Sequence, residues 1–200
     1  MEGLTTLVLL PRNPDHQEDR KKFHAIRRVE YCDKLGRETP ETETDAHDAH
    51  APFVVVKEAG KIIAGCRIVS RRSCEKSGLE LPLQHELPNV ALPTGDIAEV
   101  SRVIILPEAR RRLCVDLLLY ASIFRVLLEG EYTAMVALIR ERYFRVVNHR
   151  FPEFFQLLSD ESWEHCGEVY VPATAEIPSF RRHALTVIPR LTRSGLSASV

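Results

Sequence analysis

The chain has 200 residues, of which 44% are hydrophobic, so a single globular domain is the first expectation. A domain of this length buries roughly 70% of the surface that its unfolded chain exposes, and it needs neither a metal nor a disulfide to fold. Lysine and arginine number 27 and aspartate and glutamate 28, for a net charge of -1. This balance removes the electrostatic attraction on which nonspecific nucleic-acid binding depends, and we expect no nucleic-acid partner.

The cysteines and the start of the chain bear on where the protein works. Five cysteines, without CxxC or any zinc-ligand spacing, fit neither a closed disulfide framework nor a metal site. The opening MEGLTTLVLLPRNP lacks the basic region of a signal peptide and is expected to form an edge strand. No stretch reaches the ~20 apolar residues that cross a bilayer, so no stable membrane insertion is expected. These features predict a cytoplasmic protein without a metal.

The predicted elements alternate between strands and helices. After the edge strand come a helix over 17–35 that ends at Gly36, an acidic loop leading to Pro52, and a hairpin of strands over 52–58 and 62–70. An irregular proline-rich connection over 73–95, with room for one short helix, leads to a strand over 97–106 and a helix over 107–130. A strand over 132–139, a helix over 140–151, a strand over 167–173 and a frayed tail after Pro189 complete the chain.

Strands followed by helices twice over, after an antiparallel hairpin, predict an α/β fold. We expect a central mixed β-sheet flanked by helices on both faces. One domain would cover residues 1–200, with the segment from about 190 to 200 as a loose tail.

A carboxylate interrupts the apolar strand predicted over 97–106. Glu99 and Ser101 should share one face with Val103 and Ile105, while Arg102 points to the opposite face unless a bulge intervenes. Burying a carboxylate is unfavourable unless it is paired. A pairing arginine would keep it ionised in a structural ion pair, whereas desolvation would raise its pKa towards that of a useful general base. Both interpretations remain open at this point.

The loop before Pro52 concentrates acids and imidazoles. Glu43, Asp45, His47, Asp48 and His50 lie close together in the sequence. A solvated acidic turn is the simplest interpretation, and the wall of a pocket for a cationic amine is the second. A metal site is a weaker third, because a flexible loop implies no ligand geometry.

Three arginine features complete the set of candidates. Arg27 and Tyr31, four residues apart, are neighbours on one helical face. Arg67 lies in an otherwise apolar strand and needs a carboxylate partner, which is structural as readily as functional. A basic run of Arg110, Arg111 and Arg112 follows Pro107 without any glycine.

That basic run lies between a strand and a helix, where many acyltransferases hold the pyrophosphate of coenzyme A with glycines and helix amides. Without glycine the backbone should turn less tightly, and cations at a helix start oppose the helix dipole. We therefore expect Arg110, Arg111 and Arg112 to meet the phosphopantetheine arm of an acidic carrier protein rather than free coenzyme A.

Taken in order, these segments resemble the acyl-homoserine-lactone synthases and their relatives, which include the long-chain N-acyl amino acid synthases and the exosortase-associated acyltransferases. Order and spacing agree between residues 20 and 112. The matching positions are Arg27 and Tyr31 before Leu35-Gly36, Glu43-x-Asp45-x-x-Asp48, Gly65-Cys66-Arg67 and Glu99-x-Ser101-Arg102.

The resemblance implies a GNAT-type fold and transfer of a fatty acyl group from an acyl carrier protein to an amine. The substrate would be an acyl-phosphopantetheine thioester, and no cofactor is implied. The implied roles are Glu99 as the base, acting through water; Asp45 and Asp48 as holders of the amine end or partners of Arg67; Arg27 as the residue that orders the acceptor loop; Ser101 and Arg102 as walls of the acyl and pantetheine cleft; and Tyr31 and Glu43 as further substrate-binding residues.

One position departs from the homoserine-lactone synthases, which have a tryptophan after the Leu-Gly pair at the S-adenosylmethionine site. Here the residue is Arg37, whose guanidinium could receive a carboxylate. We therefore expect the acceptor to be an amino acid, apolar or aromatic, and the product an N-acyl amino acid. The alternatives are lactone synthesis from S-adenosylmethionine and a non-catalytic module that binds an acyl ligand or carrier protein. In the enzyme, Glu99 should line an open slot beside an apolar tunnel.

Overall fold

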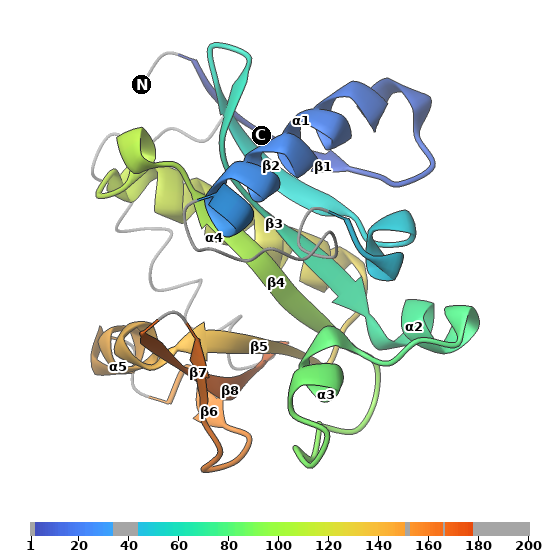
Figure 1. The fold of residues 1–200 in the computed structure, drawn as a ribbon, viewed down its shortest axis with the longest axis vertical. Coiled ribbons are helices and arrows are strands. Elements are labelled where there is room, and N and C mark those ends of the chain that lie inside the picture. The colour runs from blue at the N-terminus through green and yellow to red at the C-terminus, as the bar shows by residue number, and fades with distance from the viewer. Residues whose placement is uncertain (1–2, 34–43, 151–152, 166, 178–200) are drawn as a thin grey trace.

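A computed structural model describes residues 3–33, 44–150, 153–165 and 167–177. Its strands form one mixed sheet in the order β1-β2-β3-β4-β5-β8-β6, with β7 also paired to β8 (Figure 1). Strands β4 and β5 are parallel and the other pairs are antiparallel. The strands are β1 Leu4–Leu9, β2 Phe53–Glu58, β3 Lys61–Ser70, β4 Ile97–Ile105, β5 Ala134–Arg140, β6 Gln156–Leu157, β7 Trp163–His165 and β8 Glu168–Glu176.

Helices cover both faces of the sheet. On one face Val115 and Leu119 of α4 belong to the same apolar cluster as Val54 of β2 and Ile68 of β3. On the other face Phe23 of α1 contacts Phe53 of β2, and α3 contributes Leu83 to a separate apolar cluster. The helices are α1 Gln17–Arg28, α2 Arg71–Ser77, α3 Pro82–Glu86, α4 Leu113–Glu129 and α5 Glu141–Arg150; shorter turns are η1 Pro14–His16, η2 Val29–Asp33, η4 Ala46–Ala49 and η5 Pro107–Ala109.

The predicted fold class, a mixed sheet between two helical layers, is confirmed. Helix α4 begins at Leu113 rather than at Pro107, because Pro107–Ala109 forms a short turn and Arg111 has a left-handed backbone with φ of 68°. The connection after β3 contains two short helices rather than one. The tail predicted after Pro189 lies outside the described residues. Within the described part of the chain, no helix combines the length and apolar character needed to span a membrane.

Glycine 65 lets α1 approach the sheet closely. A Cβ at this position would lie 2.7 Å from the ring of Phe23 and 2.9 Å from the carbonyl oxygen of Val54. Both distances are shorter than real Cβ contacts, so a side chain here would push α1 away from β3. The Gly65 position in the Gly-Cys-Arg segment is therefore a packing requirement next to Arg67.

The two parallel strands at the centre of the sheet part early. Strand β4 pairs with β5 only over three positions, the last of them Glu99 with Val136. Within the described residues, the later part of β4 pairs with β3, and the later part of β5 with β8. Glu99 therefore lies where the two strands diverge.

A bulge in β4 changes which side chains share a face. Arg67 pairs with Ser101 but Gly65 pairs with Ile104, so Arg102 and Val103 oppose one residue of β3. Arg102 has φ of 55°, a conformation unusual for a residue with a side chain. The expectation that Val103 and Ile105 share the face of Glu99 is wrong: Ile105 packs with the cluster under α4, and Val103 is 41% exposed.

Candidate active site

Two aspartates from the loop before β2 meet two fully buried arginines. Arg27 of α1 donates from Nη1 to both carboxylate oxygens of Asp48, at 2.9 and 2.8 Å. Arg67 of β3 donates from Nη1 to Asp45 at 2.5 and 2.6 Å and to Asp48 Oδ1 at 3.0 Å. Both arginine side chains have 0% exposure. We call Arg27, Arg67, Asp45 and Asp48 the ionic cluster; it rules out the solvated turn as the role of these two aspartates.

The turn η4 holds the two aspartates in place by a reciprocal cap. Asp45 Oδ1 accepts a hydrogen bond from the backbone nitrogen of His47 at 3.0 Å, and Asp48 Oδ2 accepts one from the backbone nitrogen of Asp45 at 3.1 Å. The hydrogen bonds of this capping box, which lie within the turn itself, help to orient both carboxylates towards the arginines. In the described part of the chain, no group of three or more His, Cys, Asp or Glu side chains is arranged to hold a metal ion.

Glu99 is buried beside the ionic cluster rather than lining an open slot, with 3% of the residue exposed. Its Oε2 accepts a hydrogen bond from the backbone nitrogen of Leu83 at 2.7 Å. Burial raises the pKa of Glu99 to about 7, although the Leu83 hydrogen bond and the charges of Arg67 and Arg102 act in the opposite direction. No salt bridge to Glu99 occurs among the described residues. The structural ion pair is therefore not the arrangement of Glu99 among these residues.

The bulge turns Arg102 towards the face of Arg67. The Arg102 guanidinium lies 3.6 Å from Asp45 Oδ2 and 5.7 Å from the centre of the Tyr31 ring. Arg67 Nε donates to Ser101 Oγ at 3.2 Å, so Ser101 also contacts the ionic cluster. The structure therefore brings Ser101 and Arg102 to the ionic cluster, and it places Tyr31 next to Arg102.

The basic run after β4 meets carboxylates of the chain itself. Arg110 donates to Glu30 Oε2 at 3.2 Å but remains 57% exposed, and Arg112 binds both oxygens of Glu58, at 2.9 and 2.6 Å. Arg111 is exposed and adopts a left-handed backbone conformation, which glycine would adopt more readily. The role of this run in carrier-protein docking stays a prediction.

Residues 26–120 match the family model described as an acetyltransferase (GNAT) domain. This stretch has the fold of a GNAT domain. The match agrees with the parted parallel strands and the helices on both faces, and it supports an acyltransferase. No curated protein matches the chain by sequence.

Solved structures share the fold. The CoA-dependent acyl-homoserine lactone synthase BjaI, with SAM and isopentyl-CoA, is 18% identical at a TM-score of 0.75, over 98% of this chain and 92% of that chain. The AHL synthase LasI is 16% identical at a TM-score of 0.70, over 87% of this chain and 90% of that chain. An acyl-CoA N-acyltransferase from Pseudomonas aeruginosa is 13% identical at a TM-score of 0.59, over 86% of this chain and 99% of that chain.

Sequence reasoning missed some residues that lie around the candidate site. Arg20 donates to the backbone oxygens of Leu9, Ala51 and Asp48, at 2.9, 3.1 and 2.5 Å, and so clamps the loop that carries the aspartates. Arg20 lies seven residues, or two helical turns, before Arg27 on the same buried face of α1, and this spacing could have identified it from the sequence. Cys74 of α2, whose Sγ lies 3.7 Å from His47 Nδ1, gave no signal. The predicted site residues Arg37 and Glu43 lie outside the described residues.

Proposed function

We propose that this chain transfers a long-chain fatty acyl group from an acyl carrier protein to the amine of an amino acid, giving an N-acyl amino acid. The observation that carries the proposal is Glu99, a buried carboxyl group with a pKa of about 7 at the point where β4 and β5 part. Such a group is partly ionised at neutral pH and can take a proton from an incoming ammonium.

The reaction needs one deprotonation before the carbon–nitrogen bond forms. An ammonium proton passes through a water molecule to Glu99, and the free amine attacks the thioester carbonyl. The carbon–sulfur bond then breaks, the nitrogen loses its second surplus proton as the amide forms, and the leaving pantetheine sulfur takes up that proton. Atoms and charge balance without a redox cofactor or a metal in this scheme, since acyl transfer changes no oxidation state.

The surrounding residues would prepare the site for this reaction. Arg27 holds Asp48 and so orders the loop that faces the acceptor. Asp45 and Asp48 fix Arg67, while Ser101 and Arg102 form the wall next to the parting strands. Exposed Arg111 and half-exposed Arg110 would meet the acidic carrier protein. With such substrates we expect the enzyme to work in the bacterial cytoplasm.

Lactone synthesis from S-adenosylmethionine is the second candidate. It is supported by the likeness of this fold to BjaI, a CoA-dependent synthase described with SAM and isopentyl-CoA. Arg37, which stands where the lactone synthases have tryptophan, favours the amino acid acceptor instead.

The test is a matrix of donors and acceptors followed by mass spectrometry. Purified protein is incubated with long-chain acyl carrier protein or acyl-CoA as donor, and with pooled amino acids or S-adenosylmethionine as acceptor. We expect an N-acyl amino acid from the carrier-protein donor, abolished in Glu99→Gln. Lactone from S-adenosylmethionine without any amide product would establish the second candidate, and amide formed only from acyl-CoA would contradict the proposed donor.

A further inference from the structure

Arg102 differs from the other arginines of the candidate site in its lack of a full partner. Its guanidinium lies 3.6 Å from Asp45 Oδ2, which is long for a hydrogen bond, and it donates no hydrogen bond within the described part of the chain. Asp45 is already engaged, because Arg67 Nη1 donates to both of its oxygens. Another neighbour is the ring of Tyr31, whose centre lies 5.7 Å away. Arg102 therefore keeps donors that an acceptor from outside the chain can use.

The charges around Arg102 do not balance. The ionic cluster contains two arginines and two aspartates and is neutral by itself. Arg20 and Arg102 each add a positive charge beside it, and Arg20 is occupied by three backbone oxygens. Glu99 offsets part of this surplus only when it is ionised, and burial raises its pKa to about 7. At least one positive charge among these groups thus lacks a counter-charge, which favours binding of an anion.

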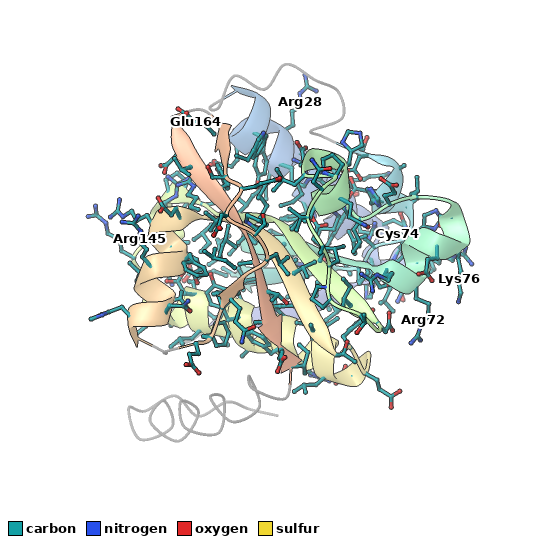
Figure 2. All side chains as sticks on the ribbon, turned by 90° about the horizontal axis from the view of Figure 1, so that it is seen from below. Arg28, Arg72, Cys74, Lys76, Arg145 and Glu164 are labelled. Carbon is teal, nitrogen blue, oxygen red and sulfur yellow. The ribbon has the colours of Figure 1, made fainter. Side chains whose placement is uncertain are left out.

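The backbone holds the Arg102 side chain in this place at the expense of strain. Arg102 has a left-handed φ of 55° at the bulge of β4, and strained residues other than glycine are concentrated at binding and catalytic sites. Its side chain is 21% exposed, whereas those of Arg27 and Arg67 are fully buried. In Figure 2, by contrast, Arg72 and Arg145 project outwards from the surface. Arg102 is therefore the arginine of the site that a small molecule from solvent can reach.

Arg102 and Glu99 are close enough to serve one acceptor molecule. They are three residues apart on β4, and a strand advances by about 3.3 Å per residue, so their Cα atoms are at most about 10 Å apart. The bulge between them shortens this separation. Burial dominates the pKa of Glu99 and raises it, while the charge of Arg102 acts in the opposite direction, so the two groups lie within electrostatic reach.

We propose that Arg102 binds the carboxylate of the acceptor amino acid, beside the ring of Tyr31. This inference rests on the proposed function and narrows its acceptors to amines with a carboxylate on the adjacent carbon. A guanidinium can bind a carboxylate through two parallel hydrogen bonds, and the bound group supplies the missing negative charge. The amine of the same molecule then lies on the side of Glu99 and reaches it through the water of the proposed reaction. Arg102 sets specificity in this scheme and takes no part in proton transfer.

The test uses pairs of acceptors that differ only in the carboxylate: L-leucine with isoamylamine, and L-phenylalanine with phenethylamine. With the carrier-protein donor, we expect the wild type to favour each amino acid over its amine by about tenfold or more in kcat/KM. Arg102→Gln should lower kcat/KM for the amino acids by about tenfold or more and leave the amines nearly unchanged, so that the preference is lost. Arg102→Lys keeps the charge without the fork of donors and should retain part of the preference.

The ratio within each pair isolates the carboxylate. Loss of the Arg102 charge also changes the pKa of Glu99, but both acceptors need the same base, so this effect cancels in the ratio. Arg140→Gln is the matched control, because Arg140 also lies near a tyrosine ring, 6.0 Å from the centre of Tyr170, but has a carboxylate partner in Glu168 at 3.5 Å. We expect this control to keep the wild-type ratio.

Circular dichroism checks that each variant folds, and if Arg102→Gln does not fold, the ratio in Arg102→Lys decides. A wild type that favours the amines, or treats both members of a pair alike, would overturn the inference. So would a wild-type ratio in the folded Arg102 variants, or a loss of preference confined to Arg140→Gln or to Arg37→Gln.

Calorimetry separates failure of this inference from failure of the proposed function. If the wild type acylates neither amino acids nor amines, the proposed function fails, but binding of L-leucine still reports on Arg102. Binding that exceeds that of isoamylamine, is lost in Arg102→Gln and is kept in Arg140→Gln supports the assignment. Equal binding of L-leucine by both variants, or no binding by the wild type, overturns it.

Discussion

The pKa of Glu99 depends on two opposing effects, burial of its carboxyl group and its interactions with neighbouring donors and cations. The hydrogen bond from Leu83 and the two nearby arginines lower the pKa of Glu99 less than burial raises it, so the pKa is about 7. Glutamine in its place can still accept the Leu83 hydrogen bond and occupies nearly the same volume. A change to glutamine therefore removes the proton acceptor while keeping the packing.

We expect Glu99→Gln to lower kcat by about 10²–10⁴-fold without loss of folding. Turnover is measured with the carrier-protein donor, and unfolding is followed in urea. Ser101→Ala serves as a comparison, since it removes only one hydrogen bond to Arg67. Full activity in Glu99→Gln would assign proton removal to another group.

The pH profile should follow the same carboxyl group. Because Glu99 accepts a proton only when ionised, kcat/KM should rise with pH through about 7. Stability should move in the opposite direction. Between about 4.5 and about 7 the folded state keeps a proton that the unfolded state has lost, so the free energy of unfolding falls as pH rises across this window and levels off above it. Urea unfolding of Glu99→Gln across that window should lack this fall.

At the scale of elements, the ionic cluster joins α1, η4 and β3. Asp48 accepts from both Arg27 and Arg67. Removing this aspartate leaves two guanidinium groups buried with less counter-charge, whereas breaking a surface ion pair changes little.

Asp48→Ala should therefore destabilise the fold by about 3–5 kcal/mol. Glu141→Ala, which breaks the exposed pair with Arg145 on α5, should change stability by less than about 0.5 kcal/mol. Urea denaturation of both variants measures the difference. Similar effects at the two positions would show that the ionic cluster is not the tie between α1, η4 and β3 that its geometry implies.

The contact between α1 and β3 gives a second prediction at this scale. Gly65→Ala sets a methyl group against Phe23 and the Val54 carbonyl, and overpacking of this kind should lower stability by about 1–3 kcal/mol. In a double-mutant cycle, Phe23→Leu should relieve part of that loss, because one of the two clashes is with the ring. Strictly additive losses would argue against the contact.

For the whole molecule, the sequence predicted the individual strands and helices better than the irregular places where they bend or diverge. The apolar runs of the hairpin and of β4, and the long α4, follow from periodicity and from Pro and Gly at their ends. The β4 bulge could not be predicted, because its left-handed residue, Arg102, is not a glycine. The early parting of β4 and β5 depends on twist and on which neighbours each strand pairs with, and no local pattern encodes that.

The candidate site shows the same division. The need of Arg67 for a carboxylate partner was predictable from a charge in an apolar strand, and the structure supplies Asp45 and Asp48. The contact between Cys74 and His47 was not predictable, since it joins two segments of ordinary composition through tertiary packing.

Carrier-protein docking is a prediction at the scale of the whole surface. Arg111 is exposed and has no ion pair within the described residues, unlike Arg112, which is bound to Glu58. Arg111→Glu should raise the KM for acyl carrier protein about tenfold at low salt, with a smaller effect at high salt. Lys22→Glu, on the exposed side of α1, is the control. Equal KM values for the two variants would remove Arg111 from the docking surface.

The divergence of β4 and β5 past Glu99 has a consequence for how the substrate preference of the enzyme could change in evolution. Beyond that point no strand of the described residues pairs with the edge of β4 that faces β5, so main-chain amides and carbonyls of β4 lie along this edge. An elongated, amide-bearing arm can be gripped there by peptide-like hydrogen bonding, as when a guest segment extends a sheet. Main-chain recognition is indifferent to which side chains the rim carries. Acyl length and acceptor choice can therefore drift through substitutions in the walls while the grip on the thioester arm persists.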